Sequence, residues 1–146
     1  MKKVSIILLS VAVAMCLSLI SCGGSVSISG GKSPSDIEMG MWKLVQKGNY
    51  QKVADYWLEN SVDEDFKDGS KEQIKMMSSM FSEKMKESMD EKGGLKDFKI
   101  ESEEISKNGT TAIVEVLLTF GNGSTEEHTS HYKKVDGKWK MNNSMK

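Results

Sequence analysis

The sequence predicts an α+β fold in which three N-terminal helices pack on a curved four-stranded antiparallel sheet. The first observation is a change in the spacing of the apolar residues. Apolar residues recur at helical spacing up to Lys92, and from Leu95 onward they alternate with polar residues, as in strands. The other is a set of glycine-containing turns, which favour tight hairpins between consecutive strands. These turns are Asn108-Gly109, Gly121-Asn122-Gly123 and Asp136-Gly137.

The first helix is expected to begin at Pro34, because proline fits the first helical position. Ser33 can serve as the N-cap, and Asp36 completes a pattern like a capping box. Gly48 ends the helix. Its inner face consists of Ile37, Met41, Leu44 and Val45.

A short second helix follows Asn49, and its inner face consists of Val53, Tyr56 and Trp57. The longest helix runs from Ser70 to Lys92 and is ended by Gly93-Gly94. Its apolar stripe is open to two interpretations, a metal or ligand face with adaptable thioethers or a buried core face. The helical spacing favours the core face. The stripe consists of Ile74, Met77, Phe81, Met85 and Met89.

The turns also predict which residues of the sheet share a face. A two-residue turn at Asp136-Gly137 sets Lys134 opposite Trp139 and Tyr132 opposite Met141. In the preceding hairpin, a two-residue loop would pair the apolar strand with Glu127 and His131, which buries charge at a cost. A three-residue loop with a bulge is therefore preferred. It puts His128, Ser130 and Tyr132 on the face of Val114, Val116 and Leu118.

Residues 1–21 have the pattern of a secretory signal. Lys2 and Lys3 give the positive start, and an apolar run too short for a stable transmembrane helix follows. The run ends Leu19-Ile20-Ser21-Cys22, which resembles the lipobox of bacterial lipoproteins and implies a lipid on Cys22. Each buried methylene of such a lipid contributes about 0.8 kcal/mol. The alternative is a plain signal peptide that leaves Cys22 as a free thiol.

Residues 22–32 are rich in Gly and Ser and are expected to form a flexible tether for a domain at residues 33–146. Gly23, with no acidic cluster behind it, resembles the sorting pattern of the outer membrane. We therefore expect a lipid-anchored protein of the bacterial envelope, on the periplasmic face of the outer membrane.

Composition argues against several classes of function. The full chain has a formal net charge of −1, and loss of Lys2 and Lys3 makes the mature part about −3. Every basic residue is lysine, and the lack of arginine and the net acidity argue against nucleic-acid binding. The other cysteine, Cys16, lies in the signal, so no disulfide is expected. His128 and His131 point to opposite faces of a strand, and the acidic run from Asp63 lacks the pattern of a calcium loop, so neither a metal nor another cofactor is expected.

Four short motifs mark the turns and the core of the predicted domain. They are Ser33-Pro34, Lys47-Gly48-Asn49-Tyr50, Ala112-x-Val114-x-Val116 and Asp136-Gly137-Lys138-Trp139-Lys140. With these motifs, the order of elements resembles the nuclear-transport-factor-2-like superfamily, a cone-shaped α+β fold, and within it a family of small bacterial lipoproteins of unassigned function. The resemblance implies a sheet that wraps around the long helix and a pocket between them. Ketosteroid isomerase and scytalone dehydratase have catalytic Asp, Tyr or His residues there, whereas other members bind ligands or dimerise through the sheet.

The predicted register makes His128 and Tyr132 candidates for this pocket, with Trp139 on the same face and Tyr56 and Trp57 nearby. A His–Tyr pair could polarise a carbonyl or shuttle a proton. A hydrogen-bonded histidine at the rim, without chemistry, is the favoured interpretation, and catalytic residues stay unknown.

Three functions remain open. The leading hypothesis is a non-catalytic module for a small apolar molecule or a peptide. The second is a scaffold that forms a homodimer through its sheet, and the third is an isomerase- or dehydratase-like enzyme. The membrane, through the lipid, is an expected partner in each case.

Overall fold

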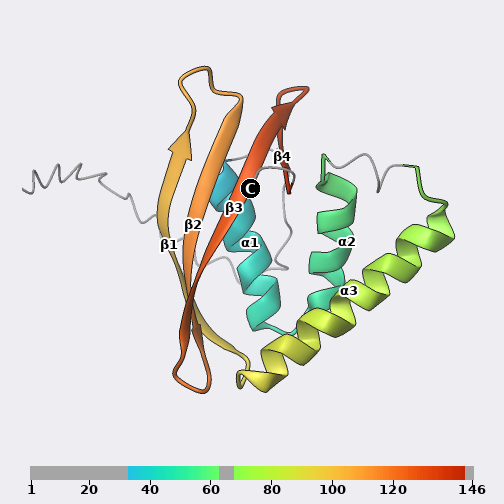
Figure 1. Ribbon diagram of the computed structural model, residues 1–146, viewed down its shortest axis with the longest axis vertical. Coiled ribbons are helices and arrows are strands. Elements are labelled where there is room, and N and C mark those ends of the chain that lie inside the picture. Colours follow the sequence, from blue (N-terminus) through green and yellow to red (C-terminus); the bar gives the residue numbers. More distant parts are fainter. Residues whose placement is uncertain (1–32, 63–67, 144–146) are drawn as a thin grey trace, which may run out of the picture.

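The computed structural model describes residues 33–62 and 68–143 (Figure 1). The expected signal at residues 1–21, Cys22, the tether and the acidic run at residues 63–67 lie outside the described residues. Three helices precede four strands, as predicted. They are α1 (Pro34–Gln46), α2 (Tyr50–Asn60), α3 (Lys71–Glu91), β1 (Leu95–Ile105), β2 (Thr111–Phe120), β3 (Thr125–Val135) and β4 (Lys138–Met141).

The four strands form one antiparallel sheet in the order β1-β2-β3-β4. Tyr132 lies opposite Met141 and Lys134 lies opposite Trp139, which confirms the register predicted from the two-residue turn. Val116 lies opposite His128, as the three-residue loop requires. Phe120 N donates to Ser124 O at 2.9 Å across that loop, which confirms its length.

The predicted capping box at Ser33 is present, and α3 has a second one. The Ser33 hydroxyl accepts a hydrogen bond from Asp36 N, and the Asp36 side chain accepts one from Ser33 N. Ser70 and Gln73 make the same reciprocal pair at the start of α3. The boxes satisfy backbone N–H groups that have no partner within the helix.

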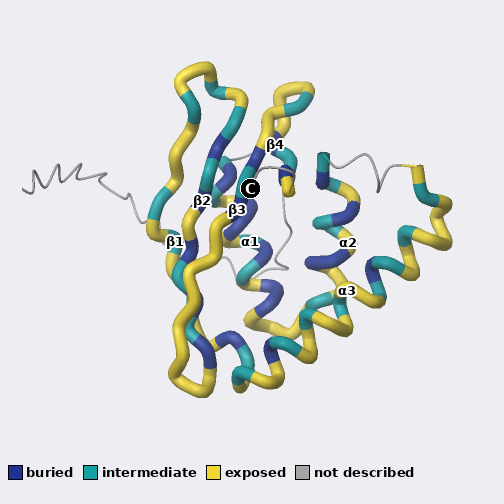
Figure 2. The backbone as a smooth tube through the Cα atoms, viewed as in Figure 1, coloured by how far each residue is buried: buried dark blue, intermediate teal, exposed yellow. Residues whose placement is uncertain are grey.

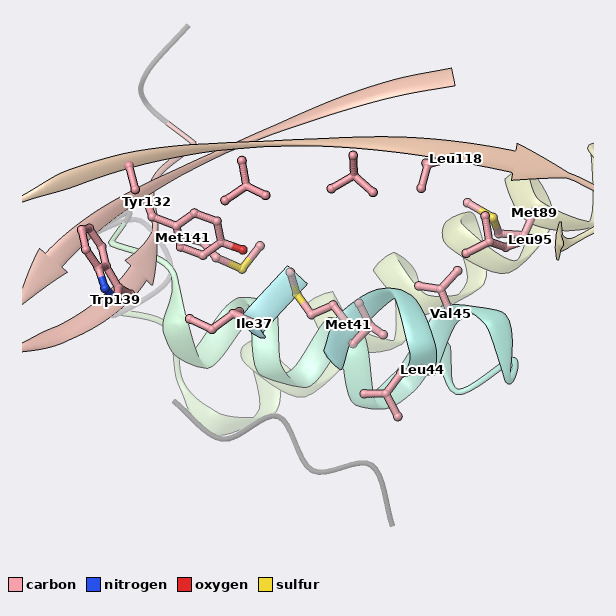
Figure 3. Packing of buried hydrophobic residues seen from close by; sticks show 14 of the residues in the cluster. Ile37, Met41, Leu44, Val45, Met89, Leu95, Leu118, Tyr132, Trp139 and Met141 are labelled. Atoms are coloured by element: carbon pink, nitrogen blue, oxygen red, sulfur yellow. The ribbon is translucent and has the colours of Figure 1, made fainter. Parts of the chain in front are cut away.

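Helix α1 lies along the concave face of the sheet and supplies its cover (Figure 3). Ile37, Met41 and Val45 point from α1 toward the strands, and Tyr132 and Leu118 point back toward α1. All five residues are buried. The expectation that the sheet wraps around the long helix is therefore wrong, because α1 occupies that position instead of α3.

Helix α3 packs mainly on α2 and extends away from the sheet (Figure 1). Most of α3 is exposed or half-buried (Figure 2). The prediction of a core face for its stripe is therefore wrong over most of the length, since Met89 alone among the five residues is buried. Phe81 is 40% exposed. Ser78 on α3 donates to Asp55 on α2 and accepts from Gln51 at 2.5 Å, which ties the two helices together.

A backbone joint at the C-terminal end of α3 fixes the direction in which the helix leaves the sheet. Gly121 N donates to Gly94 O at 2.8 Å, and Asn122 N donates to Lys92 O at 2.9 Å. The two segments come so close that a Cβ on Gly121 would lie 2.1 Å from Gly93 O. Among the described residues, no helix has the length and apolar character needed to span a membrane.

Candidate binding pocket

A pocket of about 470 Å³ lies between the three helices, β3 and the chain that follows β4. This volume is within the usual range of small-molecule sites. The residues that line it are Met41, Trp42, Val45, Val53, Trp57, Phe81, Met85, Met89, His128, Thr129, Ser130, His131, Met141, Asn142 and Asn143.

The two walls of the pocket differ in chemistry. The helical wall is made only of apolar and aromatic side chains, and it includes Phe81, Met85 and Met89 of the α3 stripe. Because α3 extends away from the sheet, Phe81 and Met85 face the pocket, and Met89 borders both the pocket and the core. The opposite wall is mainly polar and comes from consecutive residues of β3 and from Asn142 and Asn143. Thioethers adapt to ligand shape, so the helical wall suits an apolar group.

Two aromatic contacts hold four rings of the pocket in place. Trp57 stacks on Phe81, with ring centroids 4.7 Å apart and an interplanar angle of 21°. Trp42 meets His128 edge to face, with centroids 5.0 Å apart and an angle of 79°. Such arrangements suit the ring quadrupoles. The contact between Trp42 and His128 also links α1 to β3 across the pocket.

A buried carboxylate orients Trp42. Glu38 is fully buried and accepts hydrogen bonds from Trp42 Nε1 at 2.7 Å and from the Tyr132 hydroxyl at 2.5 Å. A buried carboxylate without such donors would be strongly unfavourable. The two bonds therefore stabilise Glu38 and fix the indole of Trp42 at the pocket wall.

The tyrosines near Glu38 stay protonated in the ordinary pH range. Burial raises the pKa of Tyr132 far above its usual value, and the negative charge of Glu38 raises it further. Burial, and then Glu38, also raise the pKa of Tyr56. Tyr132 therefore remains a hydrogen-bond donor to Glu38, and neither hydroxyl is prepared to act as a base.

Of the five residues predicted for the pocket, two line it. His128 lines the pocket as an exposed residue of β3, and Trp57 lines it from α2. Tyr132, Tyr56 and Trp139 lie outside the lining. The Tyr132 hydroxyl bonds Glu38, and Trp139 is buried beneath the Lys134 ammonium, 5.2 Å from the ring centroid. The structure thus does not bring His128 and Tyr132 together as an acid–base pair.

Glu38 and Trp42 were not predicted from the sequence. They are four residues apart on α1, so their side chains lie on one helix face. Glu38 also lies three residues before Met41 and seven before Val45, both of which belong to the core. An acidic residue at that spacing is a usable signal of a buried carboxylate. One of its two hydrogen-bond partners, Tyr132 on β3, comes from a distant part of the chain.

The described lining contains no carboxylate, lysine or tyrosine side chain beside its two histidines. Within residues 33–62 and 68–143, no group of three His, Cys, Asp or Glu residues could hold a metal ion. The arrangement supports binding: an apolar wall for a hydrophobic group and a polar wall for hydrogen bonds.

The sequence pattern of a domain of unknown function, DUF4878, matches residues 27–142. The chain belongs to the DUF4878 family. A comparison with curated proteins gives no match. The DUF4878 fold is similar to that of a candidate NTF2-like transpeptidase from Campylobacter jejuni, with a TM-score of 0.55, 22% identity and coverage of 76% of this chain and 98% of that one. A SEC-C-motif protein from Rhodopseudomonas palustris has a TM-score of 0.48, 14% identity and 79% coverage of each chain. The first similarity supports an NTF2-like fold.

Proposed function

We propose that this DUF4878 domain is a non-catalytic module that binds a compact apolar group. The observation that carries the proposal is the helical wall of the pocket. Its rings and thioethers, on three helices, face a space of about 470 Å³ that the protein's own side chains leave unfilled. A buried core would be packed without voids of this size.

The polar wall favours a ligand that carries hydrogen-bonding groups as well as an apolar part. Ser130 is 8% exposed and lies in the lining beside His128 and Asn142. Apolar pockets gain specificity from a few well-placed polar groups of this kind. The ligand therefore has an apolar part that contacts α3 and a hydrogen-bonding part that contacts β3.

The sequence pattern supports an anchored location for the module. The proposal includes a lipid on Cys22 and a position at the periplasmic face of the outer membrane. A matched pair of variants tests the lipid, since Cys16 lies within the expected signal. Cells grown with an alkyne-bearing fatty acid should label the wild type and Cys16→Ser but not Cys22→Ser. Label retained in Cys22→Ser would contradict the anchor.

Dye binding tests the pocket itself. N-phenyl-1-naphthylamine gains fluorescence in apolar sites and should bind the domain from residue 23 onward. Met85→Lys places a charge in the lining and should weaken dye binding at least tenfold. Met76→Lys is the matched control, because Met76 lies on the same helix but is 63% exposed. Equal effects of the two substitutions would show that the dye binds elsewhere.

Homodimer formation through the sheet stays a prediction. The convex face carries exposed Lys99, Glu115 and Lys133. A charged face of this kind gives no support to a large apolar interface.

A further inference from the structure

Among the described residues, strand β3 has an open edge beside the pocket. It has eleven residues, whereas β4 has four and pairs only with Tyr132–Val135. Among the described residues, Thr125–Ser130 pair with β2 and with no strand on the other side. The ladder between β3 and β4 therefore stops halfway along β3, where the pocket begins.

Two backbone hydrogen bonds show which groups of β3 face the open side. Lys134 N donates to Thr110 O at 2.7 Å on the β2 side, whereas His131 O accepts from Asn142 N at 2.8 Å on the β4 side. Backbone groups alternate in direction along a strand, so odd-numbered residues of β3 point toward β4. The next odd residues are Thr129 and Glu127, and their N–H and C=O groups point to the open edge.

The position of Thr129 relates this edge to the pocket. Thr129 lies in the lining together with Phe81 and Met85 of α3. A further strand paired with Thr129 would therefore lie in the space between β3 and α3. Residues directly opposite in a sheet share a face, so its residue opposite His128 would point to the pocket side.

Charge favours one kind of neighbouring residue in that strand. Glu127 is exposed, and among the described residues it forms no ion pair, whereas Glu126 binds Lys92 at 2.6 Å. The residue of an added strand opposite Glu127 would lie beside this carboxylate. Opposite charges across a strand pair are stabilising, so a lysine or arginine fits there.

The other edge of the sheet lacks these properties. Strand β1 has register shifts between Leu95 and Asp97 and between Ile100 and Ser102, which interrupt a regular ladder. Gln46 Nε2 also donates to Lys96 O at 2.7 Å. In contrast, β3 pairs with β2 without a shift from Thr125 to Lys133. The regular edge is thus the one beside the pocket.

We propose that the pocket takes an extended peptide, which adds a strand to the edge of β3 at Thr129 and Glu127. An apolar residue of the peptide enters the pocket opposite His128, and a basic residue next to it lies beside Glu127. Main-chain bonds then supply affinity and the pocket supplies specificity, as in other strand additions. This inference rests on the proposed function, because the pocket must first accept an apolar group.

The probe is a set of three fluorescein-labelled peptides, Ser-Thr-Z-Lys-Ser with Z as Leu, Met or Phe, measured by fluorescence anisotropy. Glu127→Pro removes an N–H that points to the open edge without removing a bond to β2, and proline is tolerated at strand edges. Glu127→Gln keeps the N–H and loses the same charge, so it is the matched control. We expect Glu127→Pro to weaken binding of the best peptide at least fivefold more than Glu127→Gln does.

Dye binding separates the two proposals. N-phenyl-1-naphthylamine should bind Glu127→Pro as it binds the wild type, because Glu127 lies outside the pocket lining. If the dye binds the wild type but none of the peptides does, the strand inference is wrong and the apolar pocket stands. The inference is also wrong if Glu127→Pro and Glu127→Gln bind peptide equally. If neither dye nor peptide binds the wild type, both proposals are wrong.

Discussion

The Tyr132 hydroxyl donates a 2.5 Å hydrogen bond to the Glu38 carboxylate, and both residues are fully buried. Tyr132 belongs to β3 and Glu38 to α1, so the bond joins the sheet to the helix that covers it. The same carboxylate accepts from Trp42, whose ring lines the pocket. One polar contact in the core therefore contributes to both the stability of the domain and the shape of the site.

Tyr132→Phe should destabilise the domain at neutral pH. The substitution removes one donor from a buried carboxylate, and an unsatisfied buried group costs about 1–3 kcal/mol. Urea unfolding followed by tryptophan fluorescence measures the change in the free energy of unfolding. Tyr50→Phe is the control, because Tyr50 is half-buried and its hydroxyl has no hydrogen bond among the described residues. A loss below about 0.5 kcal/mol in Tyr132→Phe would contradict the assigned role of the bond.

The stability of the wild type should fall at alkaline pH. Burial and Glu38 raise the pKa of Tyr132, so the folded state holds its proton above pH 10, where an unfolded tyrosine loses it. Where the unfolded state binds fewer protons, stability decreases as pH rises, by at most about 1.4 kcal/mol per pH unit for one group. Urea unfolding curves at about pH 8.5 give the reference stability, and curves from about pH 10 to 11 give the slope of the free energy of unfolding against pH. The slope should be smaller in Tyr132→Phe, and an equal slope would assign the effect to other groups.

The sheet could be predicted closely because its signals are local. The turn at Asp136-Gly137 fixes the pairing of Tyr132 with Met141 without reference to the rest of the fold. The three-residue loop at Gly121 was chosen by excluding a register that buried charge, and Val116 indeed lies opposite His128. Local turn chemistry and alternation are sufficient for such a meander.

Most of the pocket lining could not be predicted because it depends on which helix covers the sheet. The stripe on α3 predicts an apolar face but does not say what packs against it. Helix α1 takes the concave face, and α3 is left with Phe81 and Met85 toward a pocket. Likewise, alternation along β3 predicts His128 and Tyr132 for the site, yet the Tyr132 hydroxyl bonds Glu38, and His128 and Ser130 line the pocket from that face.

Ser78→Ala should loosen α3 without unfolding the sheet. Ser78 donates to Asp55 and accepts from Gln51, and these bonds join α3 to α2, its main packing partner. Loss of the hydroxyl leaves Asp55 without this donor, at a cost of about 1–3 kcal/mol to docking of the helix. Hydrogen–deuterium exchange should become about tenfold faster in α3 amides and unchanged in β2. Ser79→Ala, a half-buried neighbour on the same helix, is the control. Equal exchange in the two variants would contradict the role of Ser78.

Gly121→Ala should be among the most damaging single-methyl additions in the domain. The new Cβ would lie 2.1 Å from Gly93 O and 2.8 Å from Gly93 C, which are backbone atoms that cannot rotate away. The joint between the hairpin and the end of α3 must therefore open, and overpacking of this kind costs about 1–3 kcal/mol or more. Because the same joint directs α3 away from the sheet, the pocket should change as well. Urea unfolding should show lower stability, and N-phenyl-1-naphthylamine should bind more weakly.

Gly69→Ala provides the matched comparison for that prediction. Its Cβ would meet Ile74 Cγ1 at 3.4 Å, an ordinary contact, and Gly69 lies before α3 at the end remote from the joint. The backbone at Gly69 is outside the left-handed region, so alanine is accepted there without strain. We expect Gly69→Ala to keep wild-type dye affinity and stability within about 0.5 kcal/mol. If Gly121→Ala behaves the same way, the close approach of Gly121 to Gly93 does not set the direction of α3, and another contact must hold the pocket open.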